Sequence, residues 1–198
     1  SSGVKFVVTL SSVGAHLPEK TGPIAGLYDL EQRLNKLDGT HILHLRPTFF
    51  MENLLTGIDA IKNMGVNGSP VRGDIQMPMI ATQDIGQFAA ERLLKLDFTG
   101  HSTRELLGER DLSMNEVTKI LGKAIGKEDL AYVQFSYEDT EKAMQGMGIS
   151  PGVVSSFLEM NKGFNDNSIK GEEPRTADNT TKTSLEDFSR VFAAAFSG

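Results

Sequence analysis

The first periodic segment of the chain, VKFVVTL at residues 4–10, is almost continuously apolar and rich in β-branched side chains. Such a run predicts a strand that is buried on both faces, as in parallel sheets. From residue 24 to residue 37 the pattern changes to helical spacing. One side of that helix carries four leucines, Leu27, Leu30, Leu34 and Leu37. A second apolar run at residues 42–45 is stopped by Pro47, which predicts a parallel strand–helix–strand unit with an amphipathic crossover helix.

Beyond Pro47 the helical period returns at residues 50–63 and ends near Gly65. A glycine- and proline-rich stretch follows, which predicts a loose segment. A short extended piece at residues 78–82 and a helix at residues 84–96 complete the first hundred residues. The order of these elements is typical of an α/β fold.

After residue 100 the elements become shorter and the helix-start signals stronger. Ser113 and Glu116 form an S-x-x-E capping box, and Thr183 and Glu186 form a second one ahead of the C-terminal helix. The remaining periodic segments predict strands at 104–107 and 131–135 and helices at 137–144 and 151–164. The apolar face predicted for the last of these helices consists of Val153, Phe157, Met160 and Phe164. We therefore expect two domains, one at residues 1–100 and a small, mostly helical α+β region at residues 101–198.

Composition narrows the class of protein. The 198 residues are 39% hydrophobic and 23% charged, which suits a folded globular chain, and the lack of cysteine rules out disulfides and fits a cytoplasmic location. We expect no membrane span and no signal peptide. The net charge of -6, with no run of Lys or Arg, disfavours direct binding to nucleic acid.

Candidate chemistry gathers where the two predicted strands end, because ligands of open parallel sheets bind outside the carboxyl ends of the strands. Ser11 and Ser12 follow the first strand, and the corner after the second places Pro47, Thr48, Phe49 and Phe50 at the lip of the same site. The simpler alternatives are a plain turn at the serines and a proline-capped strand followed by two core phenylalanines.

Four further side chains are candidates for chemistry. Tyr28 is the candidate proton donor near this lip, although a half-buried structural tyrosine fits the same pattern. Asn53 either orients a polar ligand or caps its helix locally. His41 and His44 are three apart in a strand and point to opposite faces, so they cannot chelate one metal and no metal site is predicted.

Four blocks of the sequence resemble a known family: FVVTLSSVGA, GLYDLEQRL, HILHLRPTFFMENLL and PMIATQDIGQFAAERL. They are similar to the NmrA-like group of atypical short-chain dehydrogenases, which bind NAD(P) on a Rossmann fold. The likeness continues through DLSMNEVTKILGKAIG, and its most specific part is the R-P-x-F-F-M-E-N-L block. It implies that residues 1–100 are the second half of a Rossmann-like doubly wound parallel sheet.

By this resemblance, Ser11 and Ser12 lie beside the nicotinamide ribose, and the segment from Pro47 to Phe50 passes under the nicotinamide. Met51 and Asn53 would then face the substrate. Two features depart from the family pattern. First, no strand in this sequence is followed by G-x-x-G-x-x-G, so the chain looks like the last two-thirds of such a protein. Second, the Tyr-x-x-x-Lys motif would place a lysine four residues after Tyr28, where this sequence has Gln32.

The resemblance implies an oxidoreductase that uses NADP or NAD, in the complete protein, to reduce a small quinone-like or other planar acceptor. The alternatives are a non-catalytic NAD(P) redox sensor that regulates a protein partner, and an interaction domain that binds no nucleotide. Without the phosphate-binding third, we expect the 198 residues alone neither to bind NAD(P) measurably nor to stay monomeric, unless another polypeptide supplies that part.

Overall fold

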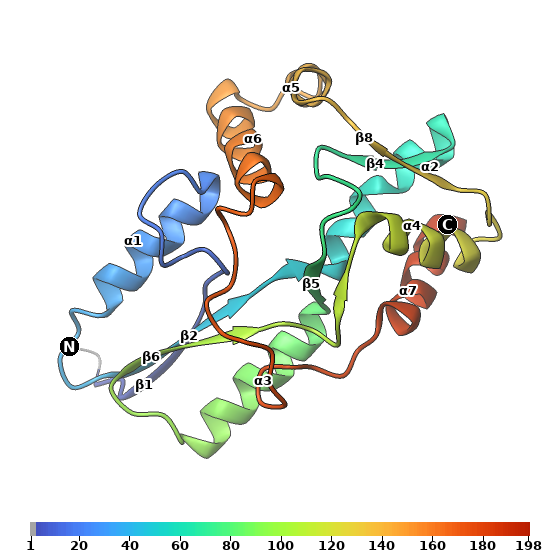
Figure 1. Ribbon diagram of the computed structural model, residues 1–198. Helices are drawn as coiled ribbons and strands as arrows, with labels where there is room; N and C mark the ends of the chain where they lie inside the picture. The colour runs from blue at the N-terminus through green and yellow to red at the C-terminus, as the bar shows by residue number, and fades with distance from the viewer. Residues whose placement is uncertain (1–2) are drawn as a thin grey trace.

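The computed structural model describes residues 3–198 and has a parallel sheet at its centre (Figure 1). Strands β1 (Phe6–Leu10), β2 (His41–Pro47) and β6 (His101–Leu106) lie in the order β1-β2-β6 and are all parallel. The predicted α/β class and the parallel strand–helix–strand unit are therefore confirmed. In the Rossmann order that the family resemblance implies, the strand at Val4 is the fifth and the strand at Ile42 is the sixth and last. The pairing of β6 on the outer side of β2 corrects that expectation.

Helices cover both faces of this sheet, as a doubly wound fold requires. On one face α1 (Ala25–Leu34) packs over β2, where its Glu31 contacts Arg46. On the other face α3 (Thr82–Lys95) contributes Ile85 to a cluster with Leu43 and Leu45. Alternate residues of β2 thus meet different helices, which explains why the strand is buried from Ile42 to Pro47.

The buried side of α1 is not the one expected from its leucines. Glu31 is 2% exposed, whereas Leu30 and Leu37 are 38% and 44% exposed. The ion pair between Glu31 and Arg46 lies on the buried side. The predicted leucine stripe is therefore wrong for Leu30 and Leu37, whereas Leu27 packs against a core cluster.

The chain leaves the sheet at Pro47 and builds two smaller ones. Strand β3 (Phe49–Phe50) pairs with β5 (Met77–Ile80), which also pairs with β7 (Asp111–Leu112). The 3-10 helix Met51–Gly57 and α2 (Ile58–Met64) form the predicted helix, and Gly65 ends it with a φ of 71°. The stretch predicted to be loose contains β4 (Val66–Ser69), which pairs in parallel with β8 (Ala131–Gln134). That correction reflects a pairing across more than sixty residues, which local periodicity does not reveal.

The last hundred residues add four α-helices: α4 (Met114–Ala124), α5 (Tyr137–Gly146), α6 (Pro151–Asn165) and α7 (Leu185–Ser197). A further 3-10 turn at Gly22–Ile24 precedes α1. The Ser113–Glu116 capping box is confirmed. The second box is wrong by one residue, because Thr183 donates to Asp84 while Ser184 caps α7.

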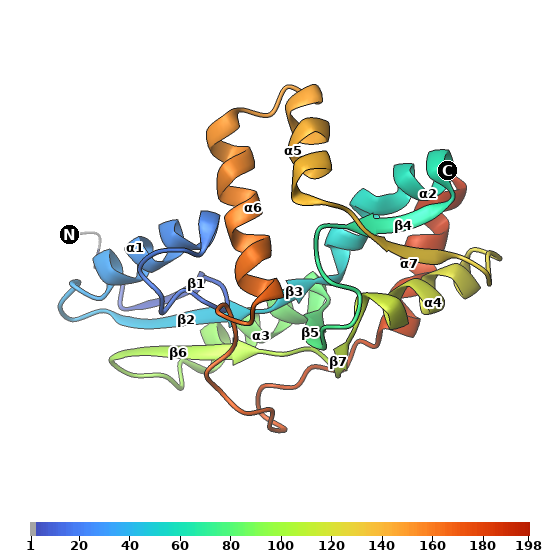
Figure 2. The same ribbon diagram turned by 45° about the horizontal axis from the view of Figure 1, so that its top comes forward.

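The apolar face of α6 also differs from the prediction. Val153 is 57% exposed, and Val154 and Leu158 are the buried residues at 1% and 7%. Phe157, Met160 and Phe164 are half-buried. Figure 2 shows α6 standing between α1 and the β4–β8 pair, which explains why one side of this helix meets a cavity and not the core.

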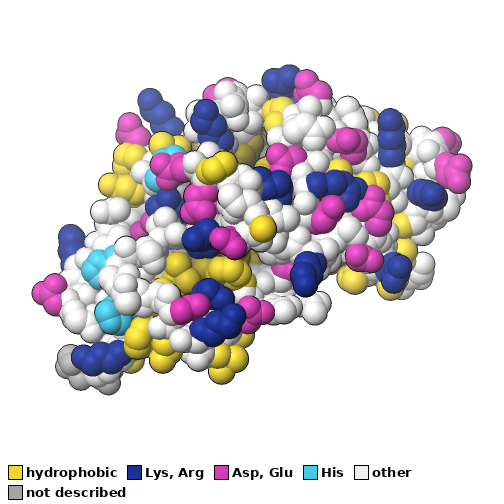
Figure 3. Space-filling model, turned by 60° about the horizontal axis from the view of Figure 1, so that its bottom comes forward, with side chains coloured by type: hydrophobic (Ala, Val, Ile, Leu, Met, Phe, Trp, Pro, Cys, Tyr) yellow, Lys and Arg dark blue, Asp and Glu magenta, His cyan; other side chains and the backbone are white. Residues whose placement is uncertain are grey.

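The two predicted domains, residues 1–100 and 101–198, contribute strands to the same sheets. Strand β6 begins at residue 101 and completes the first sheet, and β8 pairs with β4 across the predicted boundary. Within residues 3–198, no helix is both long and apolar enough to cross a membrane. On the face shown in Figure 3, basic and acidic side chains are interspersed and do not gather by sign.

Candidate functional site

A cavity of about 590 Å³ opens at the carboxyl ends of β1 and β2. Its lining is mostly apolar, and it draws on β1, the segment after β2, β4, β8 and α6. The residues that contribute are Leu10, Ser11, Ser12, Val13, Ile24, Leu27, Thr48, Phe49, Phe50, Asn53, Leu54, Thr56, Gly57, Asn67, Gly68, Ser69, Pro70, Val71, Met77, Met114, Tyr132, Phe157, Met160, Asn161 and Phe164. A site of this size and character suits a small organic molecule.

Six of the residues selected from the sequence meet in this cavity: Ser11, Ser12, Thr48, Phe49, Phe50 and Asn53. The parallel pairing brings them together, because it continues past the strands. The Ser11 amide donates to the Leu45 carbonyl at 2.7 Å, and the Val13 amide donates to the Pro47 carbonyl at 3.0 Å. Both corners therefore lie at one edge of the sheet.

Three of the selected residues do not reach the lining. Pro47 is buried in the sheet, and Met51 is 1% exposed within the main hydrophobic cluster. Tyr28 is half-buried on α1, next to Leu27, which does line the cavity. Their assignment to cofactor, substrate and proton transfer stays a prediction.

A buried ion pair lies behind the serine corner. Arg46 donates to Glu31 through two bonds, Nε to Oε1 at 3.0 Å and Nη2 to Oε2 at 2.6 Å. The Ser11 hydroxyl donates to the same Oε1 at 2.5 Å. Side-chain exposures of 9% for Arg46 and 2% for Glu31 place the pair in a weakly screened environment. This arrangement fixes the Ser11 side chain, whereas the Ser12 hydroxyl forms no hydrogen bond with another group of residues 3–198.

The pKa values around this pair follow from burial and charge. Burial alone raises the pKa of Glu31, but the hydrogen bonds from Arg46 and Ser11, with the Arg46 charge, lower it overall. Burial lowers the pKa of His44, despite the nearby Glu31 carboxylate. His44 is bonded to the Thr9 hydroxyl at 2.7 Å and to Asn35 Oδ1 at 3.0 Å, so it serves the sheet and α1 as a neutral ring.

The polar segment after α6 is tied to the same region by carboxylates. Glu105 on β6 is 1% exposed and accepts from the backbone amides of Glu172 and Glu173 at 2.8 and 3.0 Å. Glu172 in turn accepts from Arg46 at 3.1 Å. A side chain at Gly171 would come within 2.5 Å of the Glu105 carboxylate and would force that carboxylate to shift from its two backbone amides.

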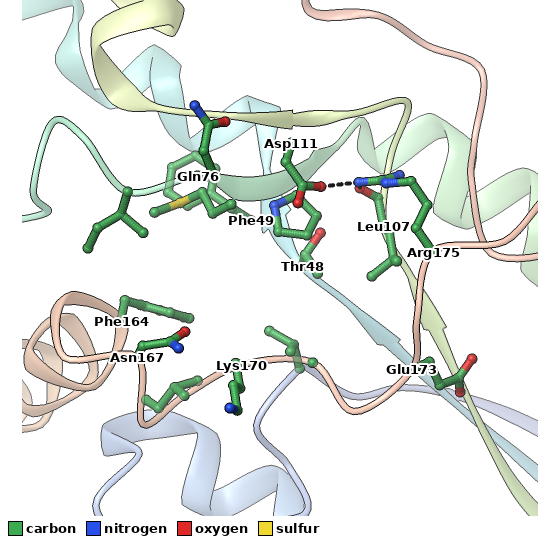
Figure 4. A pocket seen from close by; sticks show the side chains of 16 residues that line it. Thr48, Phe49, Gln76, Leu107, Asp111, Phe164, Asn167, Lys170, Glu173 and Arg175 are labelled. Carbon is green, nitrogen blue, oxygen red and sulfur yellow. Dashed lines mark hydrogen bonds and ion pairs between the residues drawn. The ribbon is translucent and has the colours of Figure 1, made fainter.

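A smaller cavity of about 260 Å³ adjoins the first and shares Val13, Thr48, Phe49, Met77 and Phe164 with it. In Figure 4, Phe164, Asn167 and Lys170 lie on one side of it, opposite Thr48, Phe49 and Gln76. Arg175 and Asp111 form an ion pair at its rim. This second cavity is the more polar of the two.

Sequence reasoning missed the polar wall that α6, β4 and β8 supply to the larger cavity. Its members are Asn67, Ser69, Tyr132 and Asn161. Tyr132 had no sequence signal beyond being an aromatic residue in a strand. The Glu31–Arg46 pair had none at Glu31, because the leucine spacing of α1 leaves that position outside the predicted apolar stripe.

A parallel sheet with helices on both faces and a cavity at the carboxyl ends of its strands defines a Rossmann-like protein. The chain belongs to the NmrA-like family, whose model matches residues 34–189. It is 28% identical to the NAD(P)H azoreductase of Xenophilus azovorans, over 99% of this chain and 68% of that relative.

Two solved structures share the fold. The NADPH-dependent quinone oxidoreductase of Escherichia coli has a TM-score of 0.78 and 21% identity, over 95% of this chain and 67% of that one. NmrA, a negative transcriptional regulator in complex with NADP, has a TM-score of 0.62 and 17% identity, over 96% of this chain and 60% of that one. The chain thus spans about two thirds of the length of these relatives.

Proposed function

We propose that the natural full-length protein is an NAD(P)H-dependent oxidoreductase that reduces a small planar acceptor in the larger cavity. The observation that carries this proposal is the cavity itself, because the most specific family block, R-P-x-F-F-M-E-N-L, contributes Thr48, Phe49 and Phe50 to its wall. The names of the relatives support the same reaction class, since one is an NAD(P)H azoreductase and another an NADPH-dependent quinone oxidoreductase.

The residues present fit the nicotinamide end of such a nucleotide. Ser12 offers a hydroxyl at the strand end, and Phe49 and Phe50 offer apolar surface for a flat ring. The sequence has no strand followed by a glycine-rich loop, so these 198 residues supply no recognisable cradle for the phosphates. When bound, the nucleotide would supply the hydride.

The chain's own contribution would be to position the acceptor and exclude water. Phe157, Met160 and Phe164 of α6 line the cavity and add to its apolar surface. Holding two reacting partners in contact replaces much of the chemical assistance that a strong acid would give. This suits a protein in which Gln32 stands at the position of the usual proton-relay lysine.

The test is oxidation of NADPH by the natural full-length protein in the presence of a panel of quinones. We expect steady oxidation, and we expect Phe49→Ala to lower kcat/KM about ten-fold because it removes one wall of the cavity. Val153→Ala is the matched control, since Val153 is an exposed apolar residue of α6 outside the lining. Equal losses in both variants, or no oxidation with any quinone, would argue against the proposal.

The second candidate is a redox sensor that binds NAD(P) and regulates a protein partner without turnover. It is supported by the fold shared with NmrA, a negative transcriptional regulator in complex with NADP. In the quinone assay a sensor would bind NADPH tightly and leave it unoxidised.

Tyr28→Phe tests the predicted proton donor. If Tyr28 donates the proton to the acceptor, the variant should have a kcat about 100-fold lower than the parent protein and the same nucleotide affinity. Because Tyr28 lies outside the cavity lining, we expect the rate to change by less than about threefold. Single-turnover rates of the variant and the parent protein decide between the two outcomes.

A further inference from the structure

The larger cavity carries no formal charge. Among the residues that the structure describes, its lining includes no Asp, Glu, Lys, Arg or His. The smaller cavity beside it differs, with Asp111, Lys170, Glu173 and Arg175 in its wall. A charged ligand group that entered the larger cavity would lose its hydration without gaining a counter-ion. The occupant of that cavity should therefore be uncharged.

The polar wall of the larger cavity, supplied by α6, β4 and β8, contains hydroxyl groups that already donate their protons to other protein atoms. The Tyr132 hydroxyl lies 2.5 Å from the Val71 carbonyl, which can only accept, so Tyr132 donates there. The Ser69 hydroxyl, 2.7 Å from the Tyr132 oxygen, must then donate to it. Burial raises the pKa of Tyr132, which keeps the phenol protonated at neutral pH. The Ser69 oxygen also accepts from the Val71 amide at 3.2 Å, so each oxygen of the pair keeps one lone pair for a ligand and neither has a free O–H.

The other hydroxyls of the lining follow the same pattern. Three more donate to protein acceptors: Ser11 to the Glu31 carboxylate, Thr48 to the Leu106 carbonyl and Thr56 to the Asn53 carbonyl. Ser12 is the exception, since its hydroxyl forms no hydrogen bond within the described residues 3–198. Five of the six lining hydroxyls therefore act as acceptors toward a ligand.

Two buried amides add further acceptors. Asn161, 4% exposed, donates from Nδ2 to the Phe157 carbonyl at 2.8 Å. Asn67, 7% exposed, donates from Nδ2 to the Thr118 hydroxyl at 2.8 Å, and that hydroxyl donates to a main-chain carbonyl of α4. Each amide keeps one N–H and its Oδ1 for other partners. The two amides add one acceptor and one donor each, and with the Tyr132 and Ser69 oxygens the side-chain acceptors outnumber the side-chain donors on this wall.

We infer that the larger cavity selects an uncharged aromatic ligand that carries O–H or N–H groups. These groups would donate hydrogen bonds to the oxygen atoms of Tyr132, Ser69 and Asn161. The inference rests on the proposed function in taking this cavity as the acceptor site. For the reductase it specifies hydroxy- or amino-substituted planar acceptors without sulfonate or carboxylate groups. A ligand without donors would leave its own polar atoms facing lone pairs.

Equilibrium binding to the natural full-length protein tests this with three naphthalene probes that differ in one substituent. We expect 2-naphthol to bind about five-fold tighter than 2-methoxynaphthalene, which lacks the donor. Naphthalene-2-sulfonate should bind at least about 30-fold more weakly than 2-naphthol because its charge has no counter-ion in the cavity. Probe fluorescence reports the dissociation constants.

Tyr132→Phe should bring the naphthol to methoxynaphthalene ratio close to one, because it removes an acceptor and frees the Ser69 proton. Ser69→Ala should also reduce the ratio and keeps the phenol, so it serves if Tyr132→Phe fails to fold. Tyr137→Phe is the matched control, since Tyr137 is bonded to Asn165 and lies outside the lining. It should keep the ratio of the parent protein.

Equal binding of the first two probes, tighter binding of the sulfonate, or no binding of any probe below millimolar concentration would overturn the inference. Binding is measured without reductant, so it is independent of the quinone assay. Selective binding without NADPH oxidation would count against the proposed reaction and leave the ligand class standing.

Discussion

Arg46→Met is expected to lower the free energy of unfolding by about 3–5 kcal/mol, because it leaves the Glu31 carboxylate buried without its partner. The pair is held by two bonds, and both side chains are less than a tenth exposed. Glu172, which also contacts Arg46, has a 55% exposed side chain and can return to water. Urea unfolding of the natural full-length protein at neutral pH measures the loss.

Two variants control this experiment. Arg72→Met removes an ion pair with Asp74 whose side chains are 49% and 64% exposed, and it should change the free energy by less than about 1 kcal/mol. Glu31→Leu combined with Arg46→Met removes both charges and should recover most of the loss. If Arg46→Met alone were as mild as Arg72→Met, the buried pair would not organise α1 on the sheet.

The same pair gives the fold a defined pH dependence. Because the pKa of Glu31 is lowered in the folded state, its contribution to stability is complete above the ordinary value of 4.5. It is lost as the pH falls through the lowered folded value. The advantage of the parent protein over Arg46→Met should therefore shrink in acid, which unfolding curves across that range would show.

The 198-residue chain expressed by itself is expected to self-associate and to bind no measurable NADPH. In the part of the chain that the structure describes, β1 pairs with β2 alone, so its other edge is free. Leu10 at the end of this strand is 54% exposed, Val4 two residues before its start is 51% exposed, and Leu30 of α1 is 38% exposed. A free, apolar strand edge favours pairing with another chain.

Light scattering should give a mass at least twice that of one chain, and titration with NADPH should show no saturation at micromolar concentration. Val4→Lys with Leu10→Lys should reduce the association, whereas Leu94→Lys should not, although Leu94 is 84% exposed on α3. A stable monomer that binds NADPH at micromolar concentration would show that the chain holds a phosphate site of its own.

Local sequence determined the elements and one edge of the site. The apolar run before Leu10, the stop at Pro47 and the Ser113 capping box each depend on neighbouring residues, and all three appear in the structure. Because parallel strands end at a common edge, the same reasoning brought Ser12 and Phe49 to one cavity.

Tertiary structure alone decided which partners these elements met. Glu31 lies outside the leucine stripe predicted for its helix, because periodicity does not show that its charge partner, Arg46, lies on a strand fifteen residues later. The β4–β8 pairing, and with it the place of Tyr132 in the cavity, joins segments more than sixty residues apart. Such contacts depend on how the whole chain closes on itself, because the free energy that selects them comes from burial between distant surfaces and is absent from any local pattern.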